Sequence, residues 1–227
     1  MNHTQISSKA SALFLTTGIA VLLVCLWLHP RDNLVTLMPI VEQGYGMWIS
    51  HMLGFVLGFW LLSLGFLAQI QSNAQWSVSW VGKLAKLFIV TGTILWMLLN
   101  TVEGIGLGVL VYQWQQASSE DAQTWFLIAQ AVFLLSEYTL NSMAVIIYGV
   151  GIFLFAQGSK YLPQIPKLVF WLLAITALWS VYLGLSLALT FAISLPTSGL
   201  QTLVEAGFPL LVLALAYYLF RSKADLP

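Results

Sequence analysis

The sequence predicts an all-α fold, a polytopic membrane bundle of six transmembrane helices that forms one domain over residues 1–227. Composition indicates this class, because 59% of the residues are hydrophobic and only 7% are charged, with a mean hydropathy of +0.89. So little charge cannot cover a water-soluble domain of this length. The second observation is six apolar runs, each near the roughly 20 residues that cross the hydrocarbon core of a bilayer.

Polar and proline-containing connections bound the six apolar runs. The first run is longer than the core of a signal peptide, and no small-residue cleavage pattern follows it, so we expect it to remain as a span. Pro39, Pro163 and Pro196 lie in connections, where proline interrupts a helix. The predicted spans are residues 12–29, 47–68, 84–112, 124–156, 168–193 and 200–220.

The basic residues predict the orientation, since short cytoplasmic loops retain Lys and Arg. Six spans leave Arg31 alone on the outer side and place seven basic residues on the inner side: Lys9, Lys83, Lys86, Lys160, Lys167, Arg221 and Lys223. Both termini are therefore expected in the cytoplasm. The net charge is zero, which favours no nucleic-acid partner, and the expected surroundings are the lipid bilayer.

Tryptophans near the span ends predict two interfacial belts. Trp27, Trp48, Trp114 and Trp125 are assigned to the outer belt, and Trp76, Trp80 and Trp171 to the inner belt. Trp60, Trp96 and Trp179 lie near mid-span, where an indole N–H needs an acceptor. We expect the belt tryptophans to contact lipid head groups.

Four ionisable residues lie inside the predicted spans, and such residues are functional-site candidates by default. They are His51, Glu103, Glu137 and Glu205, whereas His29 and Lys86 lie close to the span ends. Counted at about 1.5 Å per residue from the predicted span ends, all four lie in or near the outer half of the membrane. We infer a shared polar recess that opens outward.

Helical spacing adds two amides to this candidate site. Asn100 shares a helix face with Glu103, and Asn141 follows Glu137 by one turn, so that Asn141 is positioned to donate to the Glu137 carboxylate. A structural role is the alternative, with protonated and hydrogen-bonded carboxyl groups, because burial disfavours the charged form. The candidate ligand-binding or proton-binding residues are Glu103, Glu137, Asn141, Asn100, His51 and Glu205.

The second span carries a stripe of small residues at Gly54, Gly58 and Gly65. Such a stripe lets another helix backbone approach closely. It predicts a contact with a membrane-protein partner or with a second copy of the chain.

No complete catalytic or cofactor motif occurs in the sequence, so no cofactor is indicated and a non-enzymatic role is favoured. His29, His51 and Glu103 are weak metal-ligand candidates, but no helix carries two ligands at the spacing that bundle metal sites use. Cys25, the only cysteine, lies in an apolar run that is typical of a buried structural residue.

Several short motifs resemble a family of bacterial six-span integral membrane proteins of unknown function. They are His29-Pro30, Trp48 with His51, Glu103-Gly104, and Gly158-Ser159 followed by Tyr161-Leu162-Pro163. The resemblance covers most of the chain. It implies a six-span fold in a bacterial inner membrane and carries over no catalytic role.

Three functions follow as hypotheses. The first is an inner-membrane protein whose outward-facing acidic recess binds a proton, a cation or a small amphiphile. The second is a non-enzymatic accessory or assembly subunit of a membrane complex, which the glycine stripe favours. The third is a metal-dependent intramembrane enzyme, for which imidazole and carboxylate ligands would suit zinc or iron.

Overall fold

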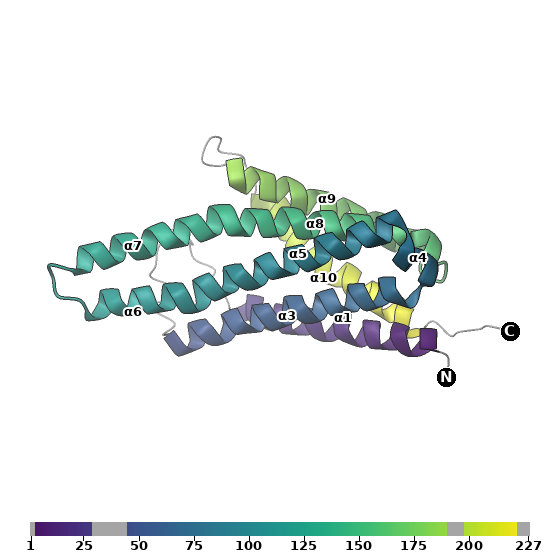
Figure 1. The fold of residues 1–227 in the computed structure, drawn as a ribbon, viewed down its shortest axis with the longest axis horizontal. Helices are drawn as coiled ribbons and strands as arrows, with labels where there is room; N and C mark the ends of the chain where they lie inside the picture. The colour runs from purple at the N-terminus through teal and green to yellow at the C-terminus, as the bar shows by residue number, and fades with distance from the viewer. Residues whose placement is uncertain (1–2, 29–44, 190–197, 222–227) are drawn as a thin grey trace.

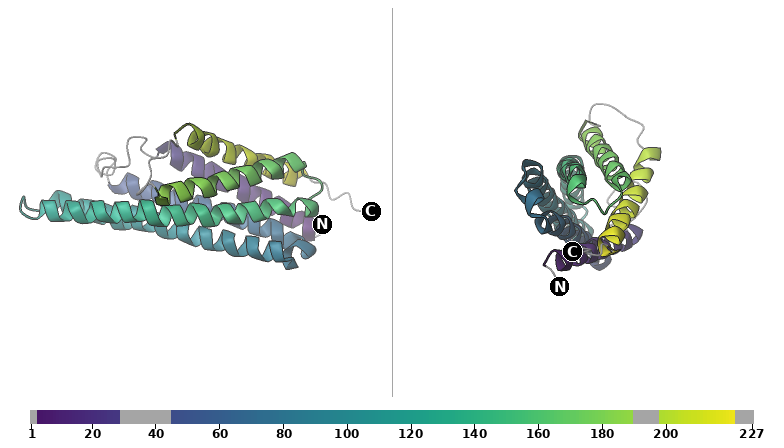
Figure 2. Two further views of the ribbon diagram at one scale, coloured as in Figure 1. Left: turned by 90° about the horizontal axis from the view of Figure 1, so that it is seen from above. Right: turned by 90° about the vertical axis from the view of Figure 1, so that its right-hand side faces the viewer.

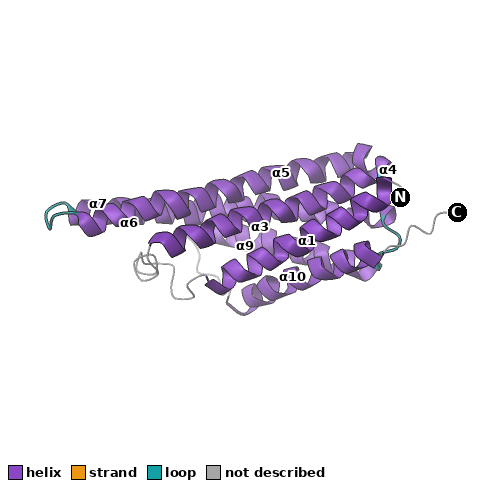
Figure 3. Cartoon of the chain, turned by 90° about the horizontal axis from the view of Figure 1, so that it is seen from below, coloured by secondary structure: helices purple, strands orange, loops and turns teal. Residues whose placement is uncertain are grey.

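The computed structural model describes residues 3–28, 45–189 and 198–221, without the side chains of residues 3–7, 45, 51, 137 and 198–206. All of its regular elements are helical (Figure 3). The α-helices are α1 (His3–Leu28), α3 (Tyr45–Ser72), α4 (Ala74–Val78), α5 (Trp80–Thr101), α6 (Gly108–Gln116), α7 (Ala122–Leu135), α8 (Ser142–Ala156), α9 (Lys167–Leu189) and α10 (Ser198–Arg221). Two π-helical turns, η1 (Val102–Leu107) and η2 (Ser136–Asn141), and one 3₁₀ turn, η3 (Gln157–Tyr161), complete the described elements.

The π turns join shorter helices into two long ones. One continuous helix runs through α5, η1 and α6 over 37 residues, and the next runs through α7, η2, α8 and η3 over 40 residues. At about 1.5 Å per residue each is more than 50 Å long, whereas the hydrocarbon core is about 30 Å thick. Figure 1 shows the consequence, because the α6–α7 end of this hairpin projects beyond the other helices.

Among the described residues, five helices are long and apolar enough to span a membrane. They confirm the predicted helical fold and are compatible with a multi-pass membrane protein. The described apolar part of α10 is shorter and covers Gly207–Arg221. The start of α1 and the end of α10 meet at one end of the bundle, where Lys9 Nζ lies 6.0 Å from the centre of the Phe220 ring. We call this the basic end, and the α6–α7 connection marks the hairpin end.

The predicted glycine stripe on α3 is the surface on which α1 packs. A Cβ atom at Gly58 would lie 2.7 Å from Leu22 Cδ2, and one at Gly65 would lie 2.6 Å from Leu15 Cγ. Gly54 faces Cys25 in the same way. Close backbone approach is therefore confirmed, and the neighbour that uses it is the first helix of the same chain.

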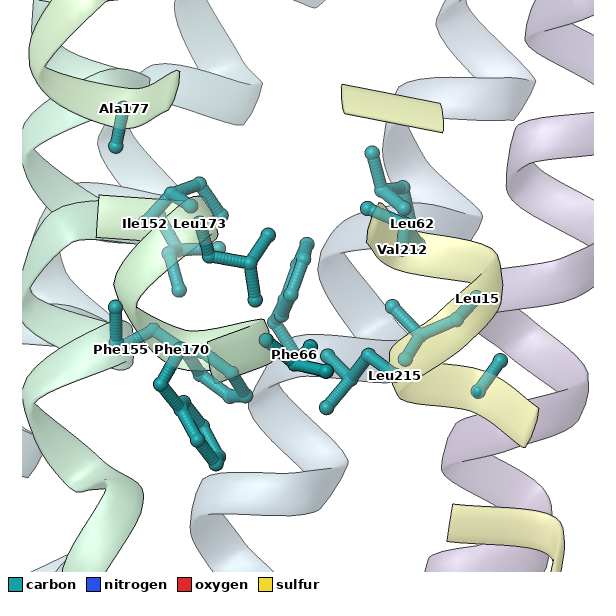
Figure 4. Close-up of a cluster of buried hydrophobic side chains, with 14 of the residues drawn as sticks. Leu15, Leu62, Phe66, Ile152, Phe155, Phe170, Leu173, Ala177, Val212 and Leu215 are labelled. Carbon is teal, nitrogen blue, oxygen red and sulfur yellow. The ribbon is translucent and has the colours of Figure 1, made fainter. Parts of the chain in front are cut away.

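The main core is a cluster of large apolar side chains that α1, α3, α8, α9 and α10 share. Figure 4 shows part of it, with Leu15, Leu62, Phe66, Phe155, Phe170, Leu173 and Leu215 turned toward one another. Helix α10 contacts both α1 and α9, and the axial view in Figure 2 shows it crossing from one to the other. Many other large apolar residues, such as Leu13, Trp171 and Leu210, are exposed on the outside of the bundle. An apolar exterior over an apolar core is what a lipid solvent allows.

The prediction of an interfacial Trp76 is wrong, because its side chain is fully buried. Asn73 begins α4, and its side-chain oxygen accepts a hydrogen bond from the Trp76 backbone N–H at 2.9 Å. This cap turns the chain after α3, so that the indole points inward and stacks on Tyr161 with ring centres 5.8 Å apart. Trp80, four residues later, remains exposed as predicted.

Candidate functional site

Within the described residues, each π-helical turn contains one of the predicted intramembrane glutamates. Glu103 lies in η1 and Glu137 in η2. A π turn inserts one extra residue into an α-helix, changes the direction of the side chains around it, and is frequent at functional sites. Side-chain directions that are predicted from the spacing of a regular α-helix therefore do not hold across either turn.

The Glu103 side chain is buried between three helical segments. It is 8% exposed, and its Oε1 atom lies 2.8 Å from the hydroxyl of Ser136, the first residue of η2. Its backbone carbonyl accepts a hydrogen bond from Trp48 Nε1 of α3 at 2.8 Å. Residues from α3, η1 and η2 thus meet at Glu103, and the two partners, Trp48 and Ser136, are not among the predicted site residues.

The Ser136 hydroxyl lies within hydrogen-bond distance of two acceptors but has only one proton to donate. Its Oγ lies 2.8 Å from Glu103 Oε1 and 2.9 Å from the carbonyl oxygen of Phe133, one turn earlier in the helix. Serine in a helix commonly donates to a carbonyl in the preceding turn. When it does so here, the contact with Glu103 needs a second proton, and only the carboxyl group of Glu103 can provide it within this pair.

Asn100 is also buried, one turn before Glu103. Its amide donates to the Trp96 carbonyl at 2.7 Å and is therefore engaged within its own helix. Gly92 faces Tyr148 and Gly151 faces Ile89, which sets an antiparallel register between α5 and α8. In this register position 100 lies at the level of position 141, so the two predicted amides belong to neighbouring segments at one depth.

A second polar layer lies further toward the basic end, and the sequence did not predict it as a unit. Ser63 Oγ lies 2.6 Å from Thr93 Oγ1 and 3.2 Å from the Tyr148 hydroxyl, and Thr93 donates to the Ile89 carbonyl at 2.6 Å. These hydroxyls form a chain that ends on a backbone carbonyl. Tyr148 follows Asn141 by seven residues, a spacing that keeps both on one helix face, and this was the only signal. Ser and Thr are common in apolar helices because they can bond to their own backbone.

Aromatic rings pack beside this second polar layer. Phe59 stacks on Trp96, with ring centres 4.4 Å apart and an angle of 8° between the planes. The edge of the Tyr148 ring meets Phe59 at 6.0 Å. The mid-span Trp96 is thus part of an aromatic wall between α3, α5 and α8.

The remaining candidates lie wholly or partly outside the described residues. His29 belongs to a segment that the structure does not describe, and for His51, Glu137 and Glu205 only the helical backbone is described. In the described part of the chain, no group of three His, Cys, Asp or Glu side chains is placed to hold a metal ion. The predicted bond between Asn141 and Glu137 stays a prediction.

Trp48 was assigned to the outer belt, and this prediction is wrong because the side chain is 2% exposed. Replacing Trp48 by Phe keeps an aromatic ring but removes the donor to the Glu103 carbonyl. We expect a loss of about 1–2 kcal/mol in the free energy of unfolding, since a buried hydrogen bond is lost and its acceptor stays.

Thermal unfolding in detergent micelles measures this loss, and Trp60→Phe is the matched control. Trp60 lies on the same helix and is 48% exposed. Equal melting temperatures for the two variants would show that the indole N–H of Trp48 does not stabilise the π turn.

Comparison with known proteins leaves the chain without an assigned relative. No family model, no curated protein and no solved structure matches it. The likeness to a six-span family therefore rests on its short motifs alone. Its function is inferred from the geometry around Glu103.

Proposed function

We propose that this chain is an inner-membrane protein whose Glu103 carboxyl group reversibly binds a proton from the hairpin side of the bundle. The observation that carries the proposal is the contact of Ser136 Oγ with both Glu103 Oε1 and the Phe133 carbonyl. A protonated Glu103 donates to Ser136, which donates to Phe133. An ionised Glu103 instead accepts a hydrogen bond from the Ser136 hydroxyl. The hydroxyl of Ser136 therefore rotates from Phe133 to Glu103 when Glu103 loses its proton.

The burial of Glu103 supports a proton-binding role. A carboxyl group inside an apolar bundle is costly to ionise, so a bound proton is favoured. Among the described residues, the basic side chains are Lys9, Lys83, Lys86, Lys160, Lys167 and Arg221. They belong to segments at the basic end of the bundle (Figure 1).

The proposed topology has six spans, with α10 as the sixth and both chain ends in the cytoplasm. The positive-inside rule supports it, because the basic residues gather at the end where α1 begins and α10 finishes. Glu103 then lies about 20 Å along its helix from Gln116, at the end of α6. Water on the outer side is the nearer source of its proton.

Infrared difference spectroscopy of the full-length protein in lipid tests the proposal. We expect a pH step across neutrality to change the C=O band of a protonated carboxyl group reversibly, and this change to disappear in Glu103→Gln. The amide is close in shape to the protonated acid, so the free energy of unfolding should change by less than about 1 kcal/mol.

Glu120→Gln is the matched control, since Glu120 is exposed in the α6–α7 connection, and it should leave the band change intact. Ser136→Ala should shift the band without removing it. A band that stays unchanged across the whole pH range would assign Glu103 a structural role, and a band change that survives in Glu103→Gln would refute the assignment.

A second candidate function is that of an accessory or assembly subunit. The projecting hairpin favours it, because Tyr112, Leu127 and Ile128 are more than 40% exposed there. A photo-crosslinking residue at position 128, with position 175 on α9 as control, should then capture a stoichiometric membrane partner. Equal labelling at both positions would indicate lipid or nonspecific neighbours.

A further inference from the structure

Helices α1 and α10 form a groove at the basic end of the bundle. The groove has a volume of about 420 Å³ and is lined by Ala12, Leu13, Thr16, Leu213, Ala216, Tyr217 and Phe220. This volume lies in the roughly 300–1,000 Å³ range of small-molecule sites. The groove is remote from Glu103, which lies in η1 toward the hairpin end (Figure 1).

The walls of the groove suit an apolar chain. The hydroxyl of Thr16 donates to the Ala12 carbonyl at 2.9 Å, so this polar group is satisfied within its own helix. Leu13 and Phe220 are 66% and 65% exposed at the sides of the groove. A polar ligand would find little to bind here, whereas a hydrocarbon chain would contact apolar atoms along its length.

Two cations lie against the aromatic rings that line the groove. Lys9 Nζ is 6.0 Å from the centre of the Phe220 ring, and Arg221 Cζ is 5.0 Å from the centre of the Tyr217 ring. One cation comes from each of the two helices, so both flank the same opening. The groove therefore combines an apolar wall with positive charge at its end.

These two cations are not neutralised by the described acidic side chains. Within the part of the chain that the structure describes, the acidic side chains are Glu103, Glu120 and Asp121, and none forms a salt bridge with Lys9 or Arg221. Glu120 and Asp121 lie in the α6–α7 connection, at the far end of the bundle (Figure 1). Among the described residues, no acidic side chain competes with a ligand for this positive charge.

We propose that this groove binds an anionic diacyl phospholipid, with one acyl chain between α1 and α10 and the phosphate between Lys9 and Arg221. Basic pockets between transmembrane helices recognise anionic head groups in this way. The guanidinium and ammonium groups donate charge-assisted hydrogen bonds to phosphate oxygens. A neutral or zwitterionic lipid would fill the same groove without the second attraction, so the site selects by head-group charge.

Native mass spectrometry of the full-length protein tests this proposal, after incubation in mixed micelles with phosphatidylglycerol or phosphatidylcholine of equal chain length. We expect one phosphatidylglycerol to be retained in preference to phosphatidylcholine. Each cation near an anionic lipid contributes about fivefold in affinity, so Lys9→Gln with Arg221→Gln should weaken phosphatidylglycerol binding about 25-fold.

The matched control is Lys83→Gln with Lys167→Gln, which removes two exposed charges from the same end of the bundle. It should leave the preference unchanged. Thr16→Trp, which fills the groove from an exposed position, should weaken both lipids and keep the charges. Loss of preference in the control pair, or equal retention of both lipids by the unmodified protein, would overturn the proposal.

Inorganic phosphate and glycerol phosphate separate the lipid from its head group. Neither should displace phosphatidylglycerol at equal concentration, because the acyl chain supplies part of the affinity. Full displacement by either anion would show a head-group site without a role for the groove, and would overturn the assignment of an acyl-chain site.

Discussion

Replacing Trp76 by Ala is expected to reduce the free energy of unfolding by about 3–5 kcal/mol, the largest effect of any substitution proposed for this chain. The indole is fully buried, and its ring centre lies 4.9 Å from that of Phe155 and 5.8 Å from that of Tyr161. Gly158 makes room for the indole, since a Cβ atom there would collide with the ring, and Gly82 makes room chiefly for the Trp76 backbone carbonyl. Alanine would leave a cavity where α4, α5 and η3 meet.

Trp80→Ala is the matched control, because Trp80 is 74% exposed and lies only one helical turn further along the chain. Thermal unfolding in detergent micelles should separate the two variants by more than 5 °C. Trp76→Phe should fall between them, since it keeps one aromatic ring in the pocket. Similar melting temperatures for Trp76→Ala and Trp80→Ala would show that this cluster does not stabilise the bundle.

Gly92→Ala is expected to cost about 1–3 kcal/mol, although alanine is the better helix former. A Cβ atom at position 92 would lie 2.8 Å from both the backbone nitrogen and the Cα atom of Tyr148. A backbone cannot rotate away as a side chain does, so α5 and α8 must separate. This displacement also disturbs the hydroxyl layer, in which Thr93 of α5 and Tyr148 of α8 both contact Ser63.

Gly106→Ala provides the comparison within the same continuous helix, because nothing lies within 4 Å of a Cβ atom there. It should leave the stability unchanged or raise it by up to about 1 kcal/mol. The ratio of folded to aggregated protein after heating, measured by size-exclusion chromatography, reports both variants. A Gly92→Ala protein as stable as Gly106→Ala would mean that α5 and α8 are not held at the distance described.

Only some residues of the candidate site could be predicted from the local sequence pattern. Glu103 and Asn100 stand out in an apolar run and are buried inside the bundle as expected. The sequence contains no sign that Ser136 contacts Glu103. The two residues lie on different long helices, and serine is common in apolar helices. The position of Trp48 near a helix end predicts a lipid belt, whereas its side chain is buried in the first turn of α3 and donates to the Glu103 carbonyl.

The glycine stripe on α3 was also predicted in part, since the sequence indicates a close helix contact but not which helix makes it. Three glycines along one face predict a close helix contact, whatever the neighbour is. The neighbour is α1, since Leu15 and Leu22 of that helix fit over Gly65 and Gly58. A variant such as Gly58→Leu therefore disrupts the chain itself and cannot serve as a test for an external partner.

The sequence pattern by itself determined the membrane class, the helical fold and the apolar runs in which Glu103, Glu137 and Glu205 lie. These properties depend on residues within one helix, and the lipid solvent leaves few alternatives to a helix. Only the tertiary structure decided that the chain forms two π turns, that Ser136 contacts Glu103, and that Trp76 is buried. Helix register and the extra residue of a π turn decide such contacts, and both arise from packing between helices far apart in the sequence.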